Sequence, residues 1–201
     1  MTNDTLATEL RDHVGVLQQT ARDHETMIAE LVELLCGCFR SGNKVLLCGN
    51  GGSAADAQHV AAEFVNRFRS DRGPLPALAL TTDSSILTSV GNDSSYEEVF
   101  ARQVEALAAK GDILVGISTS GRSANVHRAL KAARLRGAAT VGFTGQRGRD
   151  VMGGLCDLCL VVASADTARI QECHEFIFHV VCGMVETQLF QNGKGSVGRG
   201  K

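Results

Sequence analysis

The chain has 201 residues, a formal net charge of −2 and 44% hydrophobic residues, which is enough to bury one full core. One Tyr, no Trp and a nearly balanced charge offer neither a basic surface nor stacking aromatic rings, so nucleic-acid binding is not indicated. We expect a single domain over residues 1–201, with a helical segment at 5–40, a sheet-and-helix core at 44–190 and a flexible tail at 191–201.

The first forty residues show apolar side chains at helical spacing. One stripe holds Leu6, Leu10, Val14 and Leu17, and a broader one holds Met27, Ile28, Leu31, Leu34, Leu35 and Cys38. One face of a small sheet cannot cover this much apolar surface. We therefore expect the segment from Leu6 to Phe39 to contribute to an interface between subunits.

Charged residues near the start of the chain bear on localisation. Asp4, Glu9 and Arg11 stand where a signal peptide would need an uninterrupted apolar region, and no later run is long enough to cross a bilayer. We expect a cytoplasmic protein. Its seven cysteines are an odd and scattered set, which predicts reduced thiols in the core and no disulfide framework.

The most informative stretch begins at Lys44. An apolar run to Cys48 predicts a buried strand, the glycine-rich run from Gly49 to Gly52 predicts a tight loop, and Ser53 opens an alanine-rich helix. Glycines let a backbone approach a ligand closely, and the first turn of a helix can bind an anion. His59 and Glu63 stand at i and i+4 of that helix and can address the same ligand.

Three other interpretations of this loop compete. Gly49, Gly51 and Ala54 satisfy the loose dinucleotide-binding fingerprint. That fingerprint also needs an acidic residue about 20 positions later, after the next strand, and the acidic residue found there, Asp83, lies well beyond this spacing. A P-loop is excluded because no Gly-Lys-Ser/Thr follows the glycines. A plain strand–helix turn with a surface ion pair would give the same local pattern.

The next elements are a strand from Ala77 to Thr81, a polar loop and a helix from Tyr96 to Ala109. Within the loop, the segment from Val90 to Ser94 is typical of a second functional turn, because Gly, Asn and Asp gather there.

The strand–loop–helix theme then recurs. The strand from Asp112 to Ile117 leads into the hydroxyl-rich loop at 118–123 and a helix from Ala124 to Arg136. Four hydroxyls at Ser118, Thr119, Ser120 and Ser123 suit a phosphate, because hydroxyl and backbone N–H groups can both donate to its oxygens. An ordinary helix cap would need only one of them, and Ser123 is placed for it.

The remaining elements are strands at Ala139–Thr144 and Asp157–Val162 and a helix from about Thr167 to Phe190. Five strands alternating with helices predict an α/β fold, a doubly wound, flavodoxin-like parallel sheet whose ligands collect at the carboxyl ends of the strands. The glycine-rich loop at 49–52 and the hydroxyl-rich loop at 118–123 both belong to that edge of the sheet. The Cys156-x-x-Cys159 pair could be half of a zinc site, although no second pair answers it.

The last helix adds polar side chains to the candidate site. Gln171, Glu175 and His179 share one stripe, since residues four and eight apart lie on the same helical face. His174 points elsewhere. Buried His and Gln side chains are also common as hydrogen-bonded core residues, which is the competing explanation.

Together, the ordered motifs Gly49–Ser53, His59-x-x-x-Glu63, Gly91-Asn92-Asp93, Ser118–Ser123 and Arg169–His179 strongly resemble the sugar isomerase (SIS) domain family, and within it the phosphoheptose isomerases. The resemblance covers nearly the whole chain, to about Phe190. It implies an aldose–ketose isomerase that converts sedoheptulose 7-phosphate to D-glycero-D-manno-heptose 7-phosphate, the first step of nucleotide-activated heptose biosynthesis.

The resemblance also implies a homotetramer with active sites between subunits, acid/base work by Glu63 and His179, and one zinc ion per chain. The implied zinc ligands are His59, Glu63, Gln171 and His179. The implied substrate-binding residues are Asn50, Gly51, Gly52, Ser53, Glu63, Arg67, Asn92, Asp93, Ser118, Thr119, Ser120, Ser123 and Gln171.

Two rival functions stay open. A non-catalytic SIS protein that binds a replication initiator would lack the carboxylate and imidazole at Glu63 and His179, and both are present here. An isomerase of another sugar phosphate is the closer alternative, because no feature of the sequence indicates how many carbons the substrate has. Whether Glu175 or His174 joins the site is also open.

Overall fold

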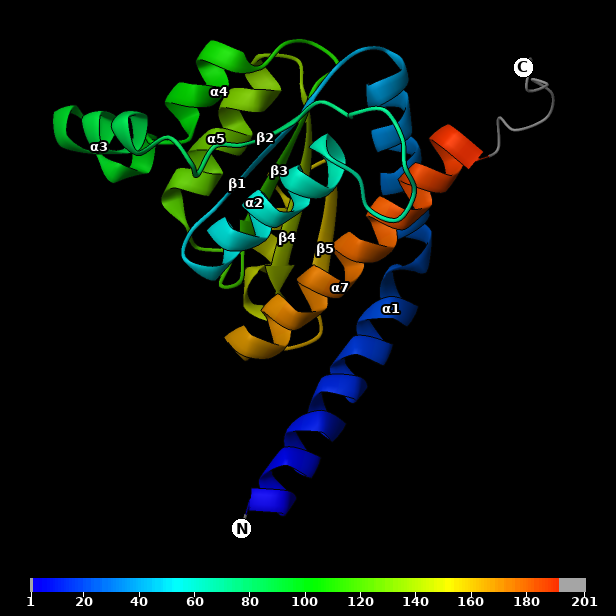
Figure 1. Ribbon diagram of the computed structural model, residues 1–201. Coiled ribbons are helices and arrows are strands. Elements are labelled where there is room, and N and C mark those ends of the chain that lie inside the picture. The colour runs from blue at the N-terminus through cyan, green and yellow to red at the C-terminus, as the bar shows by residue number, and fades with distance from the viewer. Residues whose placement is uncertain (1, 192–201) are drawn as a thin grey trace, which may run out of the picture.

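The computed structural model describes residues 2–191, and it begins with one long helix, α1 (Thr2–Arg40). The carboxyl-terminal half of α1 is buried at Leu31 and Leu35, where it packs on the helix α7 and strand β5 described below. Its amino-terminal half projects beyond the rest of the fold (Figure 1) and exposes 71% of Leu6 and much of Leu10. The expected helical segment is confirmed as a single continuous helix.

A five-stranded sheet forms the centre of the fold. Its strands are β1 (Val45–Gly49), β2 (Ala77–Ala79), β3 (Ile113–Ser118), β4 (Ala139–Gly145) and β5 (Leu158–Val162). They pair in parallel in the order β2-β1-β3-β4-β5. The three central strands are buried almost throughout, which explains why their sequences read as continuous apolar runs. The predicted doubly wound α/β fold is confirmed.

Helices cover both faces of this sheet (Figure 1). On one face, α1 packs with α2 (Gly52–Val65) and α7 (Thr167–Glu186), and their side chains share a core with Leu47, Val115 and Phe143. On the other face lie α4 (Ala101–Leu107), α5 (Ala124–Leu135) and α6 (Arg149–Gly153), around Phe100 and Leu114. As a result, α2 and α7 are neighbours on one face, and the side chains between them can meet.

The segment between β2 and α4 differs from the prediction. The expected polar loop is a helix, α3 (Ser84–Asp93), whose start is capped by Asp83, since its carboxylate accepts the N–H of Ile86 at 2.9 Å. The helix predicted at Tyr96–Ala109 is two pieces, a 3₁₀ turn η1 (Tyr96–Glu98) and α4. No residue of α3 is fully buried, although Leu87 and Val90 pack partly against the core. The segment consists mostly of Ser, Thr, Gly, Asn and Asp, which favour turns, and this composition masked the helix.

The chain's cysteines are free thiols, and all but Cys159 are buried. Burial raises the pKa of Cys48 to about 12, which keeps it protonated. Within residues 2–191 no group of metal-binding side chains includes Cys156 or Cys159, so the half zinc site has no partners.

At the end of the described chain, α7 is followed by a π-helical turn, Thr187–Gln191. The predicted tail at 191–201 lies outside the described residues, apart from Gln191. None of the described helices is long and apolar enough to cross a bilayer.

Candidate active site

The loop that joins β1 to α2 depends on three glycines. Gly51 has φ +57° and ψ −122°, a conformation that side chains disfavour. A Cβ on Gly49 would lie 2.6 Å from the carbonyl oxygen of Ser53, and one on Gly52 would lie 2.2 Å from Nε2 of Gln171. The loop therefore turns tightly, and it brings the start of α2 and the side chain of Gln171 together.

A reciprocal pair of amides joins this loop to the start of α5. Nδ2 of Asn50 donates to Oδ1 of Asn125 at 2.9 Å, and Nδ2 of Asn125 donates back to Oδ1 of Asn50 at 2.9 Å. The hydroxyl of Tyr96 also donates to Asn50, at 3.1 Å. The sequence analysis missed Asn125 and Tyr96, because a lone polar residue in a helix or turn carries no distinctive pattern.

The hydroxyl-rich loop follows β3 at the same edge of the sheet. Ser118 is buried, and its Oγ lies 2.9 Å from Oγ of Ser123. Ser123 occupies the N-cap position of α5, yet its side chain makes no capping hydrogen bond. Gly121, at φ +66°, lies so close to Gly148 that an added Cβ would approach its Cα to 2.2 Å. The serine hydroxyls thus face one another at a helix N-terminus, and helix capping does not account for them.

Imidazole and carboxylate groups from α2 and α7 meet beside the glycine loop. Oε1 of Glu175 lies 3.0 Å from Nε2 of His59 and 3.3 Å from Nε2 of His179. Oε1 of Glu63 lies 3.5 Å from the same nitrogen of His59. Of these four side chains, His59, Glu175 and His179 offer ligand atoms that all lie within 4.8 Å of one another. Two imidazole nitrogens and one carboxylate oxygen are a donor set that suits zinc.

Asp56 is a partly buried carboxylate one helical turn before His59. Burial, and then the negative charge of Glu175, raise the pKa of Asp56 to about 6, although His59 opposes the shift. Oδ2 of Asp56 is buried and has no hydrogen-bond partner among the described residues. Asp56 is thus costly to ionise because its carboxylate is partly buried, and the nearby negative charge of Glu175 adds to that cost.

The expected zinc ligands are therefore only partly brought together. His59 and His179 meet, and Glu63 stands at the edge of the cluster. Gln171 contacts the glycine loop at Gly52. Glu175 joins the cluster. His174 does not, because it lies on the buried face of α7, with its Nε2 3.3 Å from the carbonyl oxygen of Thr144 on β4.

Three other expected residues lie away from the two loops within this single chain. Arg67 is exposed just beyond the end of α2. Asn92 and Asp93 end the projecting helix α3 (Figure 1), where Nδ2 of Asn92 donates to Oδ1 of Asp93 at 2.8 Å. The predicted functional turn at Val90–Ser94 is thus wrong as local structure, because most of it is helical.

Comparisons with known proteins identify the family. Residues 10–145 match the model of the SIS domain. The phosphoheptose isomerase of Roseiflexus sp. (strain RS-1) is 56% identical over 183 residues, which are 91% of this chain and 92% of the relative. The chain belongs to the phosphoheptose isomerases. These enzymes are aldose–ketose isomerases.

Solved structures agree with this assignment. The phosphoheptose isomerase of Neisseria gonorrhoeae superposes with a TM-score of 0.86 at 40% identity and covers 93% of this chain and 100% of its own. That of Francisella tularensis gives a TM-score of 0.88 at 34% identity, covering 93% and 99%. These solved relatives therefore share the long α1 and the parallel sheet of this chain.

Proposed function

We propose that the chain interconverts sedoheptulose 7-phosphate and D-glycero-D-manno-heptose 7-phosphate through an enediol. The observation that carries the proposal is the juxtaposition of two chemically different parts at one edge of the sheet. The Asn50–Asn125 amide pair ties the glycine loop to the start of α5, into which the hydroxyl-rich loop leads, and the same glycine loop opens α2, which carries His59 of the His59–Glu175–His179 cluster. An extended sugar phosphate can reach from one part to the other.

The phosphate end of the substrate binds the hydroxyl-rich loop. Ser118, Thr119, Ser120 and Ser123 surround the start of α5, where backbone N–H groups and the helix dipole favour an anion. The Ser118–Ser123 hydroxyl contact supports this assignment, because two hydroxyls that satisfy each other can turn outward to the phosphate oxygens at little cost. This loop acts as the anchor of the substrate.

The reacting carbons lie at the other end, near α2 and α7. Moving the carbonyl from C2 to C1 requires a base that takes a proton from one carbon and returns it to the next, and we assign this to Glu63. His179 would exchange protons with O1 and O2 of the substrate. The sugar hydroxyls bind along the path between the two ends, which is lined by Asn50, Gly51, Gly52, Ser53 and Gln171.

We also propose that the cluster binds one zinc ion per chain. His59, Glu175 and His179 would hold it, since their ligand atoms all lie within 4.8 Å of one another. Bound there, zinc would polarise the carbonyl and stabilise the negative charge of the enediolate. A carboxylate that binds zinc tightly is a poor base. Because Glu175 supplies the converging carboxylate, Glu63 remains available for proton transfer, with Gln171 as a further neutral donor to the ion.

The protein assembles as a homotetramer in this proposal. An apolar cavity of about 520 Å³ lies between α1 and α7, lined by Ile28, Val180 and Met184 among others, and Phe176 beside it is 44% exposed. A monomer rarely leaves such a surface uncovered. Assembly would also allow Arg67, Asn92 and Asp93 to contribute to a site between subunits, since α3 buries no residue in the single chain.

The test is turnover of sedoheptulose 7-phosphate followed by NMR in D₂O, beside a panel of five- and six-carbon ketose phosphates. We expect the heptulose to be converted fastest, with deuterium at C2 of the aldose product. Faster turnover of a shorter sugar phosphate would overturn the substrate assignment. No turnover of any of them would favour a non-catalytic SIS protein.

A further inference from the structure

A buried ion pair joins α7 to the segment that follows α2, outside the residues assigned so far. Nε of Arg72 donates to Oε2 of Glu186 at 3.1 Å, and both side chains are 2% exposed. The same carboxylate accepts three successive backbone N–H groups, from Phe68 at 3.1 Å, Arg69 at 3.1 Å and Ser70 at 2.6 Å. One side chain of α7 therefore holds the whole backbone turn at 68–70 in place.

The other end of Arg72 holds the last turn of α2. Its Nη2 donates to the carbonyl oxygen of Glu63 at 2.7 Å, and its Nη1 donates to that of Phe64 at 2.8 Å. Carbonyls in the last turn of a helix have no helical partner, and a cation suits the negative end of the helix dipole. The guanidinium thus fixes the backbone of Glu63.

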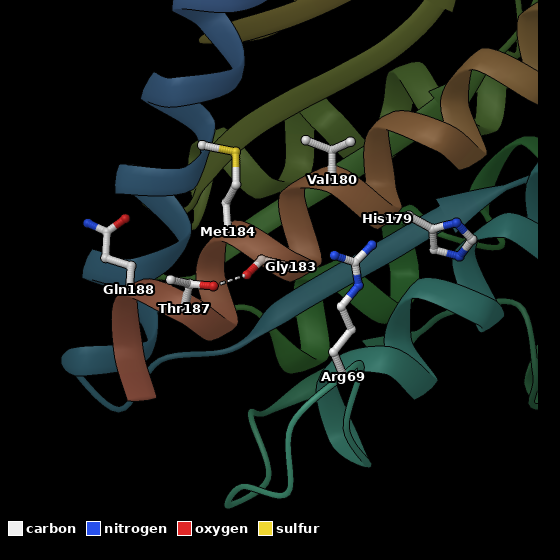
Figure 2. A pocket seen from close by; sticks show the side chains of 7 residues that line it. All are labelled: Arg69, His179, Val180, Gly183, Met184, Thr187 and Gln188. Atoms are coloured by element: carbon white, nitrogen blue, oxygen red, sulfur yellow. Dashed lines mark hydrogen bonds between the residues drawn. The ribbon is translucent and has the colours of Figure 1, made fainter. Parts of the chain in front are cut away.

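The turn that Glu186 holds reaches His179. The ring of Phe68 stacks on the His179 imidazole with centroids 5.4 Å apart and planes 20° apart. Gly183 lies beside the ring, since an added Cβ would meet Cε1 of Phe68 at 3.4 Å, an ordinary contact distance. Figure 2 shows Arg69 extending from the same turn toward α7, beside His179 and Gly183. Phe68 therefore backs the imidazole on one side.

We propose that Arg72 and Glu186 are positioning residues, which set the place of Glu63 on α2 relative to His179 on α7. The inference rests on the proposed roles of those two residues in proton transfer. A buried ion pair by itself is a weak source of stability, because the loss of hydration offsets much of the attraction. The hydrogen bonds of this pair do reach the site, however. Arg72 bonds the backbone of Glu63, and Glu186 bonds the backbone of Phe68, whose ring packs on His179.

The experiment compares Arg72→Lys with Asp112→Asn. A lysine keeps the charge but lacks the planar fork that bonds Glu186 and two carbonyls at once. Asp112 is an equally buried carboxylate that accepts the N–H of Lys44 at 3.0 Å and of Ala109 at 2.8 Å, at the opposite end of the sheet. Both changes break a buried network, and only one of those networks reaches the site.

We expect kcat of Arg72→Lys to fall at least about 10-fold while KM for sedoheptulose 7-phosphate changes less than about 3-fold, because misplaced reacting groups slow chemistry while the phosphate anchor is untouched. Asp112→Asn should lose stability but keep kcat within about 2-fold. Equal kcat in the parent and Arg72→Lys would overturn the proposal. Glu186→Gln serves as a second variant, in case Arg72→Lys does not fold.

A second readout does not depend on turnover. The stacked ring of Phe68 shifts the NMR resonances of the His179 imidazole, so these should move in Arg72→Lys and stay in place in Asp112→Asn. Unmoved resonances in Arg72→Lys would contradict the positioning role. A parent protein without turnover would contradict the proposed function instead, and the two failures are thereby distinguishable.

Discussion

His59 Nε2 and His179 Nε2 lie 2.9 Å apart, although 120 residues separate the two histidines in the chain. Two ring nitrogens can approach this closely only when a proton or a cation lies between them, because two lone pairs repel. Glu175 adds a carboxylate oxygen 3.0 Å from one of them and 3.3 Å from the other. The sheet therefore brings α2 and α7 together into a site that attracts positive charge.

The first prediction concerns metal binding. His59→Ala and His179→Ala should each remove most of the zinc that the parent retains after loading and desalting, because each deletes an imidazole ligand. Glu175→Gln should bind zinc more weakly than the parent. The measurement is zinc per chain by elemental analysis. His13→Ala, which alters a histidine paired with Glu172, is the control and should retain parental zinc. Parental zinc in Glu175→Gln would exclude Glu175 as a ligand.

The second prediction concerns the proton shuttle. Glu63→Gln keeps the shape and hydrogen bonding of the side chain and removes its basicity, so kcat should fall by about 10²- to 10⁴-fold. Turnover and zinc content are measured on the same samples. Glu97→Gln changes a carboxylate that pairs with Arg128 on the other face of the fold, and it should turn over like the parent. Undiminished turnover by Glu63→Gln at equal zinc would remove Glu63 from the mechanism.

The third prediction concerns the phosphate anchor. Ser123→Ala should raise KM for the sugar phosphate several-fold, with a smaller effect on kcat, because a contact far from the reacting carbons mainly supports binding. Inhibition by inorganic phosphate should weaken in parallel. Ser89→Ala, on α3, removes a hydroxyl bonded only to its own helix and should change neither value. An unchanged phosphate inhibition constant in Ser123→Ala would count against the anchor.

The fourth prediction uses His174, which is fully buried against the ring of Phe143. Burial lowers its pKa from 6.5 to about 4, although the Thr144 carbonyl opposes the shift. Between these values the unfolded chain binds a proton that the folded chain does not, so stability falls as pH drops from about 6.5 to 4. The contribution of this residue is roughly 3 kcal/mol.

Urea unfolding at several pH values tests this prediction. His174→Gln should lose stability at neutral pH, where the imidazole is well packed, but its stability should depend less steeply on pH than that of the parent. The difference between the two proteins isolates His174 from the carboxylates that titrate in the same range. Parallel pH dependences would show that His174 is protonated as readily in the folded as in the unfolded state.

The fifth prediction concerns assembly. Light scattering at micromolar concentration should give the mass of a tetramer, and Leu10→Glu combined with Val14→Glu should shift it toward smaller species, because charges replace an exposed apolar stripe of α1. Leu135→Glu alters a side chain that is 89% exposed on α5 and should leave the mass unchanged. A monomeric parent would contradict the interface.

Much of the fold follows from local sequence. Continuous apolar runs at Val45–Gly49 and Ile113–Ser118 are buried central strands, and the glycines and serines directly after them form the loops at the edge of the sheet. These features are readable because a parallel strand needs apolar side chains on both faces, and a tight loop needs glycine. The region around α3 was misjudged, because its many Ser, Thr, Gly, Asn and Asp residues are typical of a turn and outweighed the short apolar stripe of Leu87 and Val90.

The composition of the candidate site was decided by tertiary structure. His59 and Glu63 could be paired from their spacing, and so could Glu175 and His179, because each pair occupies one turn of a single helix. No local pattern could say that the two pairs meet, or that Oε1 of Glu175 lies within 3.3 Å of a nitrogen of both imidazoles. Nor could it reveal the Asn50–Asn125 pair or the bonds from Arg72 and Glu186. The contacts of the imidazoles and of Arg72 and Glu186 depend on how α2 and α7 pack side by side, and the amide pair depends on how α5 lies beside the glycine loop. Sequence by itself determined which residues can do the chemistry, and the packing of distant helices decided which of them stand together.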